Sequence, residues 1–174
     1  MSKVQIDTEA PDFVLNDFDG KKISLSDYRN KKNVLLVLNR GFLWPFCRRH
    51  IAQLRQKSDK LTNLDIEVLV AGPENSDSFR RYWKKESLPF KGLPDPNHSV
   101  MKLYGQEVKL FKLGRMPAQM LIDKSGILKF VYYGNSMSDI PDISELEKTL
   151  SSEWIQQQFR AVIMKKRKGF KDEC

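Results

Sequence analysis

The chain has 174 residues, of which 40% are hydrophobic and 30% are charged, as is typical of one globular domain with its own core. The longest apolar run, residues 34–38, is too short to cross a membrane, and the N-terminal residues lack the apolar stretch of a signal peptide. We therefore expect a soluble, cytoplasmic protein. The net charge is +8, but the basic run at residues 165–168 has no interleaved aromatic residues, which predicts a solvated tail rather than a nucleic-acid site.

Cysteine and histidine are scarce. The chain has two cysteines, Cys47 and Cys174, and two histidines, His50 and His98. Their spacing fits neither a disulfide framework nor a zinc site, so no metal and no cofactor is expected. In a reducing compartment a cysteine is either an inert core residue or a reactive group.

Strand signals follow one another along the chain. Residues 13–15 and 23–25 flank the turn dipeptide Asp19-Gly20 and predict a hairpin. Residues 34–38 and 66–71 are apolar throughout, as strands covered on both faces are. Later, strands are predicted at residues 119–122 and 127–133, joined by a turn at 123–126.

Helix signals separate these strands. Apolar residues at helical spacing predict a helix that begins near Cys47, a second around residues 79–83 capped by Asn75 or Ser76, and a short third that stops at Gly105. A final helix is predicted to begin at Pro141, with an apolar face of Ile143, Leu146, Leu150 and Trp154.

The order of the elements predicts an α/β fold. Strand, helix and strand early in the chain require a parallel pair with a crossover helix, whereas the late hairpin adds antiparallel strands. We expect a mixed sheet sandwiched by helices, with the N-terminal hairpin as an extension. Residues 1–164 should form a single domain and residues 165–174 a basic C-terminal tail.

The segment GFLWPFCRRH, residues 41–50, puts Cys47 after a buried strand and on the first turn of the following helix. Free N–H groups at a helix start stabilise a thiolate, and Arg40, Arg48 and Arg49 add positive charge nearby. We therefore expect a lowered thiol pKa and a nucleophile suited to peroxides or disulfides. His50 is expected to pack or face solvent rather than to act as a base.

A second segment, GRMPAQMLID at residues 114–123, places Pro117 just before a strand. A proline there can hold a cis peptide and direct its backbone at a facing loop. Arg115 could bring a guanidinium over Cys47 and stabilise the thiolate and a developing oxyanion, or it could be a surface loop residue.

Several segments together resemble a known family. They are APDFVLNDFDGKKISLSDYR, VLLVLNRGFLWPFCRRHIAQL, LPFKGLPDPNHSVMKLYG and RMPAQMLIDKSGILKFVYYGNSMSDIPDISELEKTL. In this order they are similar to peroxiredoxins of the alkyl hydroperoxide reductase and thiol-specific antioxidant family, within the thioredoxin-fold superfamily. The resemblance implies a thioredoxin-like fold, with Cys47 as peroxidatic cysteine and Pro117 as a cis-proline. We expect the active site to be lined by Trp44, Pro45, Phe46, Met116 and Pro117, with Trp44 and Phe46 there for packing rather than for stacking on a substrate.

The motif departs from the family at two places. Peroxiredoxins have a proline seven residues, and a threonine or serine three residues, before the reactive cysteine, where this chain has Arg40 and Trp44. Closer relatives have a first cysteine at the position of Trp44. Without that thiol, a Cys-x-x-Cys dithiol cycle cannot run locally.

We therefore expect a thiol peroxidase that reduces hydroperoxides through Cys47, with electrostatic help from Arg115, Arg40 or Arg48. A sulfenic acid would form on Cys47 and be recycled by thioredoxin or a low-molecular-weight thiol. Cys174 is the internal candidate for a resolving cysteine, within one chain or across a homodimer; the alternative, which we favour, is a free terminal thiol without a role. The alternatives are a monothiol that exchanges with disulfides and a non-catalytic thioredoxin-fold module for binding or regulation.

Overall fold

The computed structural model describes residues 2–109, 111, 114–136, 138–141, 144, 146 and 148–149. The chain divides into two compact units, Met1–Pro141 and Asp142–Cys174, and the fold below is that of the first. Most of the predicted final helix, the boundary expected at residue 164 and Cys174 lie outside the described residues, so these expectations stay predictions. No helix in the described ranges is both long and apolar enough to span a membrane.

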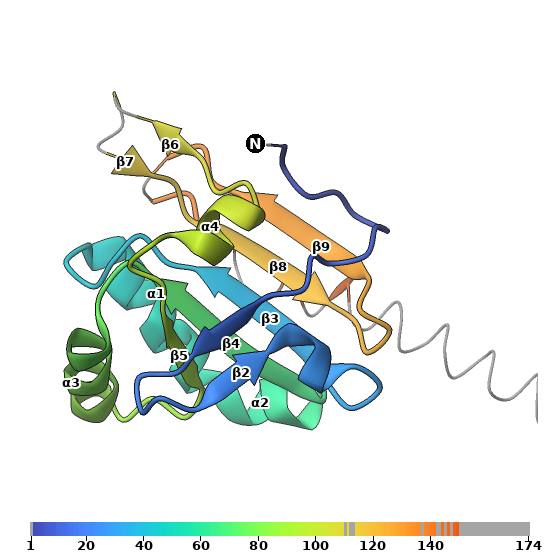
Figure 1. Cartoon of the computed structure of the whole chain (residues 1–174), viewed down its shortest axis with the longest axis horizontal. Helices are drawn as coiled ribbons and strands as arrows, with labels where there is room; N and C mark the ends of the chain where they lie inside the picture. The colour runs from blue at the N-terminus through green and yellow to red at the C-terminus, as the bar shows by residue number, and fades with distance from the viewer. Residues whose placement is uncertain are drawn as a thin grey trace, which may run out of the picture. The chain divides into compact units, whose positions relative to one another are not determined.

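A five-stranded mixed sheet forms the centre of the first unit (Figure 1). Its strands, in spatial order, are β5 (Lys91–Pro94), β4 (Ile66–Gly72), β3 (Asn33–Leu38), β8 (Ala118–Ile122) and β9 (Leu128–Tyr133). β3, β4 and β5 are parallel, whereas β8 is antiparallel to both β3 and β9. The predicted mixed sheet, with its parallel pair first and its hairpin last, is confirmed.

Helices connect the strands. They are α1 (Pro45–Gln56), α2 (Ser58–Asn63), α3 (Ser76–Glu86), α4 (Ser99–Leu103) and the 3₁₀ helix η1 (Leu25–Tyr28). The single helix expected after Cys47 is in fact two, because α1 ends at Lys57. Asn75 caps α3 as predicted, since its side chain accepts a hydrogen bond of 3.0 Å from the Ser78 amide.

Two small hairpins stand outside the central sheet. β1 (Val14–Asn16) pairs with β2 (Lys22–Ser24), which confirms the predicted N-terminal hairpin. β6 (Val108–Lys109) pairs with β7 (Gly114–Arg115), and the sequence did not predict this pair. Strands of two residues are too short to show an alternating pattern.

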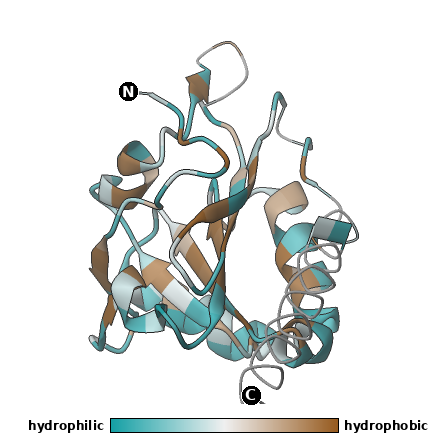
Figure 2. Ribbon diagram, turned by 90° about the vertical axis from the view of Figure 1, so that its right-hand side faces the viewer, coloured by the Kyte–Doolittle hydropathy of each residue, from teal (hydrophilic) through white to brown (hydrophobic). Residues whose placement is uncertain are grey.

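The sheet has two differently covered faces. Val34, Leu36 and Leu38 of β3 belong to a core that also includes residues of the β1–β2 hairpin and of α4. Side chains alternate along a strand, so Leu35 and Val37 point to the opposite face. In Figure 1 the hairpin and α4 lie in front of the sheet and α1 and α2 behind it. Figure 2 shows the strands as the mainly hydrophobic part of the unit.

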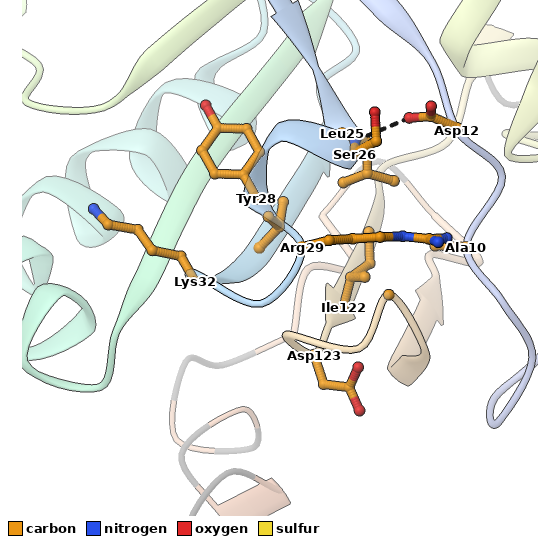
Figure 3. Close-up of a pocket in the computed structure, with 11 residues that line it drawn as sticks. Ala10, Asp12, Leu25, Ser26, Tyr28, Arg29, Lys32, Ile122 and Asp123 are labelled. Carbon is orange, nitrogen blue, oxygen red and sulfur yellow. Dashed lines mark hydrogen bonds between the residues drawn. The ribbon is translucent and has the colours of Figure 1, made fainter.

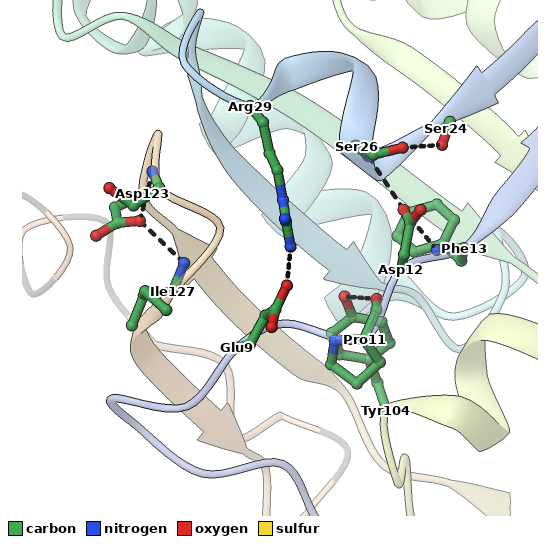
Figure 4. A network of polar contacts seen from close by, with 11 residues as sticks. Glu9, Pro11, Asp12, Phe13, Ser24, Ser26, Arg29, Tyr104, Asp123 and Ile127 are labelled. Atoms are coloured by element: carbon green, nitrogen blue, oxygen red, sulfur yellow. Dashed lines mark hydrogen bonds and ion pairs between the residues drawn. The ribbon is translucent and has the colours of Figure 1, made fainter.

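Polar contacts attach the N-terminal segment to this core (Figure 4). The Glu9 carboxylate pairs with Arg29, and the Asp12 carboxylate accepts a 3.0 Å hydrogen bond from the Ser26 amide. The Tyr104 hydroxyl donates to the Pro11 carbonyl at 2.7 Å. A small hollow beside these contacts is drawn in Figure 3, and Cys47 does not line it. These contacts hold the N-terminal segment in place.

An aromatic layer on α3 leaves no room for a side chain on β5. A Cβ atom added to Gly92 would lie 2.7 Å from Cδ1 of Phe79 and 2.8 Å from Cε2 of Trp83. Both rings are buried and cannot move aside freely. We expect Gly92→Ala to destabilise the protein by about 1–3 kcal/mol, measured by urea unfolding.

A double-mutant cycle provides the control. In a Phe79→Leu background one of the two rings is smaller, so adding the Gly92 methyl should cost less than in the wild type. An equal cost in both backgrounds would show that the clash with Phe79 is not the cause.

Candidate active site

Cys47 lies where the sequence predicted it, beyond the end of β3 and in the first turn of α1. Pro45 occupies the start of the helix, where its fixed φ angle favours the helix and its missing N–H leaves no bond unmade. Trp44 precedes it in an extended conformation and gives the helix no side-chain cap. The first-turn N–H groups thus remain available to stabilise negative charge near Cys47.

The Cys47 thiol is buried, with 3% of the residue exposed. This burial raises the thiol pKa above its ordinary value, and the charge of Glu74 raises it further. The Arg40 backbone N–H, which hydrogen-bonds the sulfur, and the Arg40 guanidinium charge both lower the pKa, but they offset the burial only in part. The expectation of a lowered pKa is therefore wrong, because the effect of desolvation outweighs that of the cations.

Arg40 and Trp44 contact each other. The guanidinium carbon of Arg40 lies 4.3 Å from the centroid of the Trp44 ring, a cation–π contact, and Arg40 is only 5% exposed. These are the two positions at which the chain departs from the peroxiredoxin motif. The two residues that depart from the motif therefore pack against each other.

Glu74 supports the loop between β3 and α1. Its Oε1 atom accepts a hydrogen bond of 2.5 Å from the Phe42 amide, and burial raises the pKa of its carboxyl group. Gly41 has a φ of +132° in this loop, and a Cβ atom there would lie 2.9 Å from the same oxygen. The sequence interpretation missed Glu74. Its position just after β4 was the available signal, because neighbouring parallel strands bring their carboxyl ends together.

A cavity of about 10 Å³ adjoins Cys47. Its lining residues come from the end of β3, from α1, from β8 and from the segment after β9: Val37, Leu38, Asn39, Cys47, His50, Pro117, Ala118, Gln119, Ile140 and Pro141. His50 lines the same cavity as Cys47, because residues three apart share one face of a helix. His50 is 6% exposed, and burial lowers its pKa to about 4, so its imidazole is neutral at neutral pH.

Pro117 lines this cavity, but the peptide bond before it is trans, since no cis bond occurs in the described part of the chain. The cis-proline that the resemblance implied is therefore wrong. The backbone of Met116 is held from the other side: its N–H donates to the Glu107 carbonyl, and its carbonyl accepts from the Gln106 side chain, both at 2.9 Å. These bonds are made with the ordinary trans geometry.

The other predicted site residues take different positions. Arg115 lies on β7 and interacts electrostatically with Asp95, while the charges that act on the Cys47 thiol are those of Arg40 and Glu74. Arg48 is exposed, and its charge acts on Tyr82. Pro45 and Phe46 are also exposed, and neither lines the cavity, nor does the buried Met116. Of the predicted catalytic set, the structure thus brings Cys47 and Arg40 together.

The outer side of the loop borders an open groove of about 450 Å³. The rings of Phe42 and Tyr82 stack there, with centroids 4.3 Å apart and an interplanar angle of 4°. Leu43 also lines the groove and is 89% exposed. Cys47 is not among the lining residues, so the groove does not open onto the thiol.

The opposite effects of Arg40 and Glu74 on the thiol can be separated by substitution. Glu74→Gln removes a negative charge and should lower the pKa of Cys47, whereas Arg40→Gln removes a positive charge and should raise it. The Arg40 backbone N–H remains in both variants. The measurement is the rate of iodoacetamide alkylation against pH, in a Cys174→Ser background so that one thiol reacts.

Glu9→Gln is the matched control, because Glu9 pairs with Arg29 and does not act on the thiol. Shifts of the same sign in the Arg40 and Glu74 variants would contradict the assigned electrostatics.

His50 should make the stability depend on pH. Its pKa is about 4 in the folded protein and 6.5 ordinarily, so its contribution is complete above pH 6.5 and is lost as the pH falls toward 4. Over this window the wild type should lose about 3 kcal/mol more unfolding free energy than His50→Gln. Urea unfolding at several pH values checks this. His98→Gln is the control and should keep most of the loss of unfolding free energy at low pH, because His98 is only partly buried. If the unfolding free energy of His50→Gln depended on pH as strongly as that of the wild type, His50 would not be its cause.

Comparison with known proteins agrees with this architecture. The profile of the AhpC/TSA family matches residues 6–131. The chain is 29% identical to the chloroplastic peroxiredoxin Q of Oryza sativa subsp. japonica over 152 residues, which cover 86% of this chain and 68% of that protein. It is 30% identical to the peroxiredoxin bcp of Haemophilus influenzae over 137 residues, which cover 76% of this chain and 88% of that protein.

Solved structures show the same fold. The peroxidoxin BcpB of Mycobacterium tuberculosis superposes with a TM-score of 0.70 at 16% identity, covering 84% of this chain and 94% of that one. The reduced 2-Cys peroxiredoxin of Plasmodium vivax gives a TM-score of 0.78 at 19% identity, covering 88% and 84%. The chain therefore belongs to the AhpC/TSA family and is a peroxiredoxin-like redoxin with the thioredoxin fold, as its motifs predicted.

Proposed function

We propose that the protein is a thiol peroxidase that reduces hydroperoxides through Cys47 alone and is recycled by thioredoxin or a small thiol. The single observation that carries the proposal is the position of Cys47 on the first turn of α1, where its sulfur accepts a hydrogen bond from the Arg40 N–H. The chain belongs to the AhpC/TSA family. The relatives named as peroxiredoxins support this class of enzyme.

The reaction begins when the thiol gives up its proton to water, so that the overall step consumes a thiol and a hydroperoxide and yields a sulfenic acid and an alcohol. The thiolate then attacks the terminal oxygen of the hydroperoxide, so that an S–O bond forms as the O–O bond breaks. The sulfur is oxidised to the sulfenic acid, and the leaving alkoxide takes up a proton to give the alcohol. Arg40 and the helix N-terminus stabilise the negative charge on sulfur during this step.

Burial favours a peroxide over a disulfide as the oxidant. A disulfide carries a bulky group on each sulfur, and both sulfurs must lie in line with the attacking sulfur. Cys47 is only 3% exposed, and the cavity beside it has a volume of about 10 Å³. A small hydroperoxide needs much less room. The monothiol disulfide-exchange alternative is therefore the weaker of the two.

Recycling needs a thiol from elsewhere. With tryptophan at position 44, a thiol must attack the sulfenic sulfur, release water and form a mixed disulfide, which a second thiol then reduces. This attack requires more access to the sulfur than the structure provides, because Cys47 is buried. Resolution by Cys174, assembly into a homodimer and a cytoplasmic location stay predictions.

The test is peroxide consumption with hydrogen peroxide and a thioredoxin system or dithiothreitol. Cys47→Ser should fall to the rate measured without protein, because the nucleophile is lost. Cys174→Ser, the matched control, should keep the wild-type rate with dithiothreitol.

Equal rates for wild type and Cys47→Ser would disprove the proposal and favour a non-catalytic module. Loss of activity in Cys174→Ser would contradict recycling by an external thiol alone.

A further inference from the structure

The cavity beside Cys47 is lined by polar atoms that have no partner. Nδ2 of Asn39, Nε2 of His50, and both Oε1 and Nε2 of Gln119 are buried and make no hydrogen bond among the described residues. The three residues are 4%, 6% and 1% exposed, respectively. Buried polar atoms are nearly always hydrogen-bonded, because each one left unpaired costs free energy. Such a group of atoms around one cavity therefore points to a ligand.

The alternation of side chains along β3 and the register between β3 and β8 bring these residues together. Asn39 continues the side of β3 that carries Leu35 and Val37, and Gln119 pairs with Val37 in the neighbouring β8. Both amides consequently face α1. His50 comes from α1 itself, one helical turn after Cys47, so the polar atoms and the thiol meet at the same cavity.

The size of the cavity limits what it can hold. A volume of about 10 Å³ is close to the smallest that admits one water-sized oxygen, so a whole organic peroxide does not fit. One oxygen atom bound there can reach hydrogen-bond donors and acceptors alike, because amides offer both and a neutral imidazole nitrogen is one or the other.

These groups are poorly suited to remove the thiol proton. His50 has a pKa of about 4, whereas burial raises the pKa of Cys47, so a complete proton transfer to the imidazole is strongly uphill. Amides do not titrate in this range. The cluster is instead a set of neutral hydrogen-bonding groups, which suits a neutral S–O–H group that both donates and accepts.

We propose that Asn39, His50 and Gln119 form a receiving site for the oxygen atom that a peroxide transfers to Cys47. The site rests on the proposed peroxidase function and assigns these residues a positioning role in it. In the thiol form one water can bind the same atoms. When the S–O bond forms, the sulfenic oxygen takes that place.

The site has a consequence for the lifetime of the oxidised enzyme. Further oxidation to the sulfinic acid requires a deprotonated, accessible sulfenate and a second peroxide. A sulfenic acid held as the neutral group in a cavity of this size meets neither condition. The site should therefore keep Cys47 in the reducible sulfenic state until an external thiol arrives.

The experiment measures how long the sulfenic acid lasts. Full-length protein with Cys174→Ser is mixed with one equivalent of hydrogen peroxide, quenched in acid at intervals and weighed by intact mass spectrometry. The species with one added oxygen is followed as it decays, and an excess of peroxide then gives the rate of the second oxidation. Gln119→Met, which keeps the side-chain size but removes both unpaired atoms, is compared with the parent.

We expect the sulfenic acid to decay about 3- to 10-fold faster in Gln119→Met, the factor for one lost hydrogen bond of typical net strength. The rate of the second oxidation, from sulfenic to sulfinic acid, should rise by a similar factor. The reduced form of the variant should be at least as stable to urea as the parent, because unpaired polar atoms have been replaced by apolar ones. A merely structural glutamine would give the opposite pattern, with lower stability and an unchanged lifetime.

Met120→Leu is the matched control, since Met120 is the next residue of β8 but belongs to the core on the other face of the sheet. It should leave the lifetime unchanged. His50→Phe tests the same site from α1, so the proposal stays falsifiable if Gln119→Met does not fold. A lifetime equal to that of the parent in either folded variant would overturn the receiving site. Absence of any sulfenic acid on Cys47 in the parent would instead overturn the peroxidase function, and the receiving site with it.

Discussion

The pairing of β3 on both edges is the constraint on which the rest of this structure depends. β3 is parallel to β4 and antiparallel to β8, and both of its faces are covered. These pairings fix the position of the carboxyl end of β3. The loop after β3 starts from that point and leads into α1, which carries the thiol in its first turn. The same pairings bring Glu74, which follows β4, and Gln119, within β8, to the end of the strand that precedes Cys47. The site is assembled by sheet register rather than by the local motif alone.

Burial of the thiol sets the chemical character of this site. A cysteine at a helix start among arginines would be a ready thiolate if water reached it, but desolvation here favours the neutral form. A closed, protonated thiol reacts slowly with bulky reagents and with disulfides. The pKa of the thiol depends in addition on the opposite charges of Arg40 and Glu74, and the Phe42 amide of the loop holds Glu74.

The two departures from the peroxiredoxin motif have a common structural meaning. Arg40 and Trp44, which stand at the two positions of departure, form a cation–π contact with each other. With tryptophan in place of the first cysteine of closer relatives, a Cys-x-x-Cys cycle cannot run locally, and under the proposed mechanism the oxidised thiol has to persist until an external thiol arrives. The small cavity beside Cys47, with the amides of Asn39 and Gln119 in its lining, is the site that we propose to hold the oxidised group during that time.

The sequence by itself determined the main strands, the N-terminal hairpin, the start of α1 and the position of Cys47 on it, because apolar runs, turn dipeptides and capping residues are local signals. It could not determine the break at Lys57, the two-residue strands β6 and β7, or the trans peptide before Pro117, which depend on packing and on distant partners. Only the tertiary structure decided which side chains meet the thiol. Arg40 acts on the thiol whereas Arg115 interacts electrostatically with Asp95, and His50, Asn39 and Gln119 share the cavity of the thiol. The physical reason is that a pKa and a cavity are set by burial and by neighbours from other strands, and no spacing within one segment encodes either.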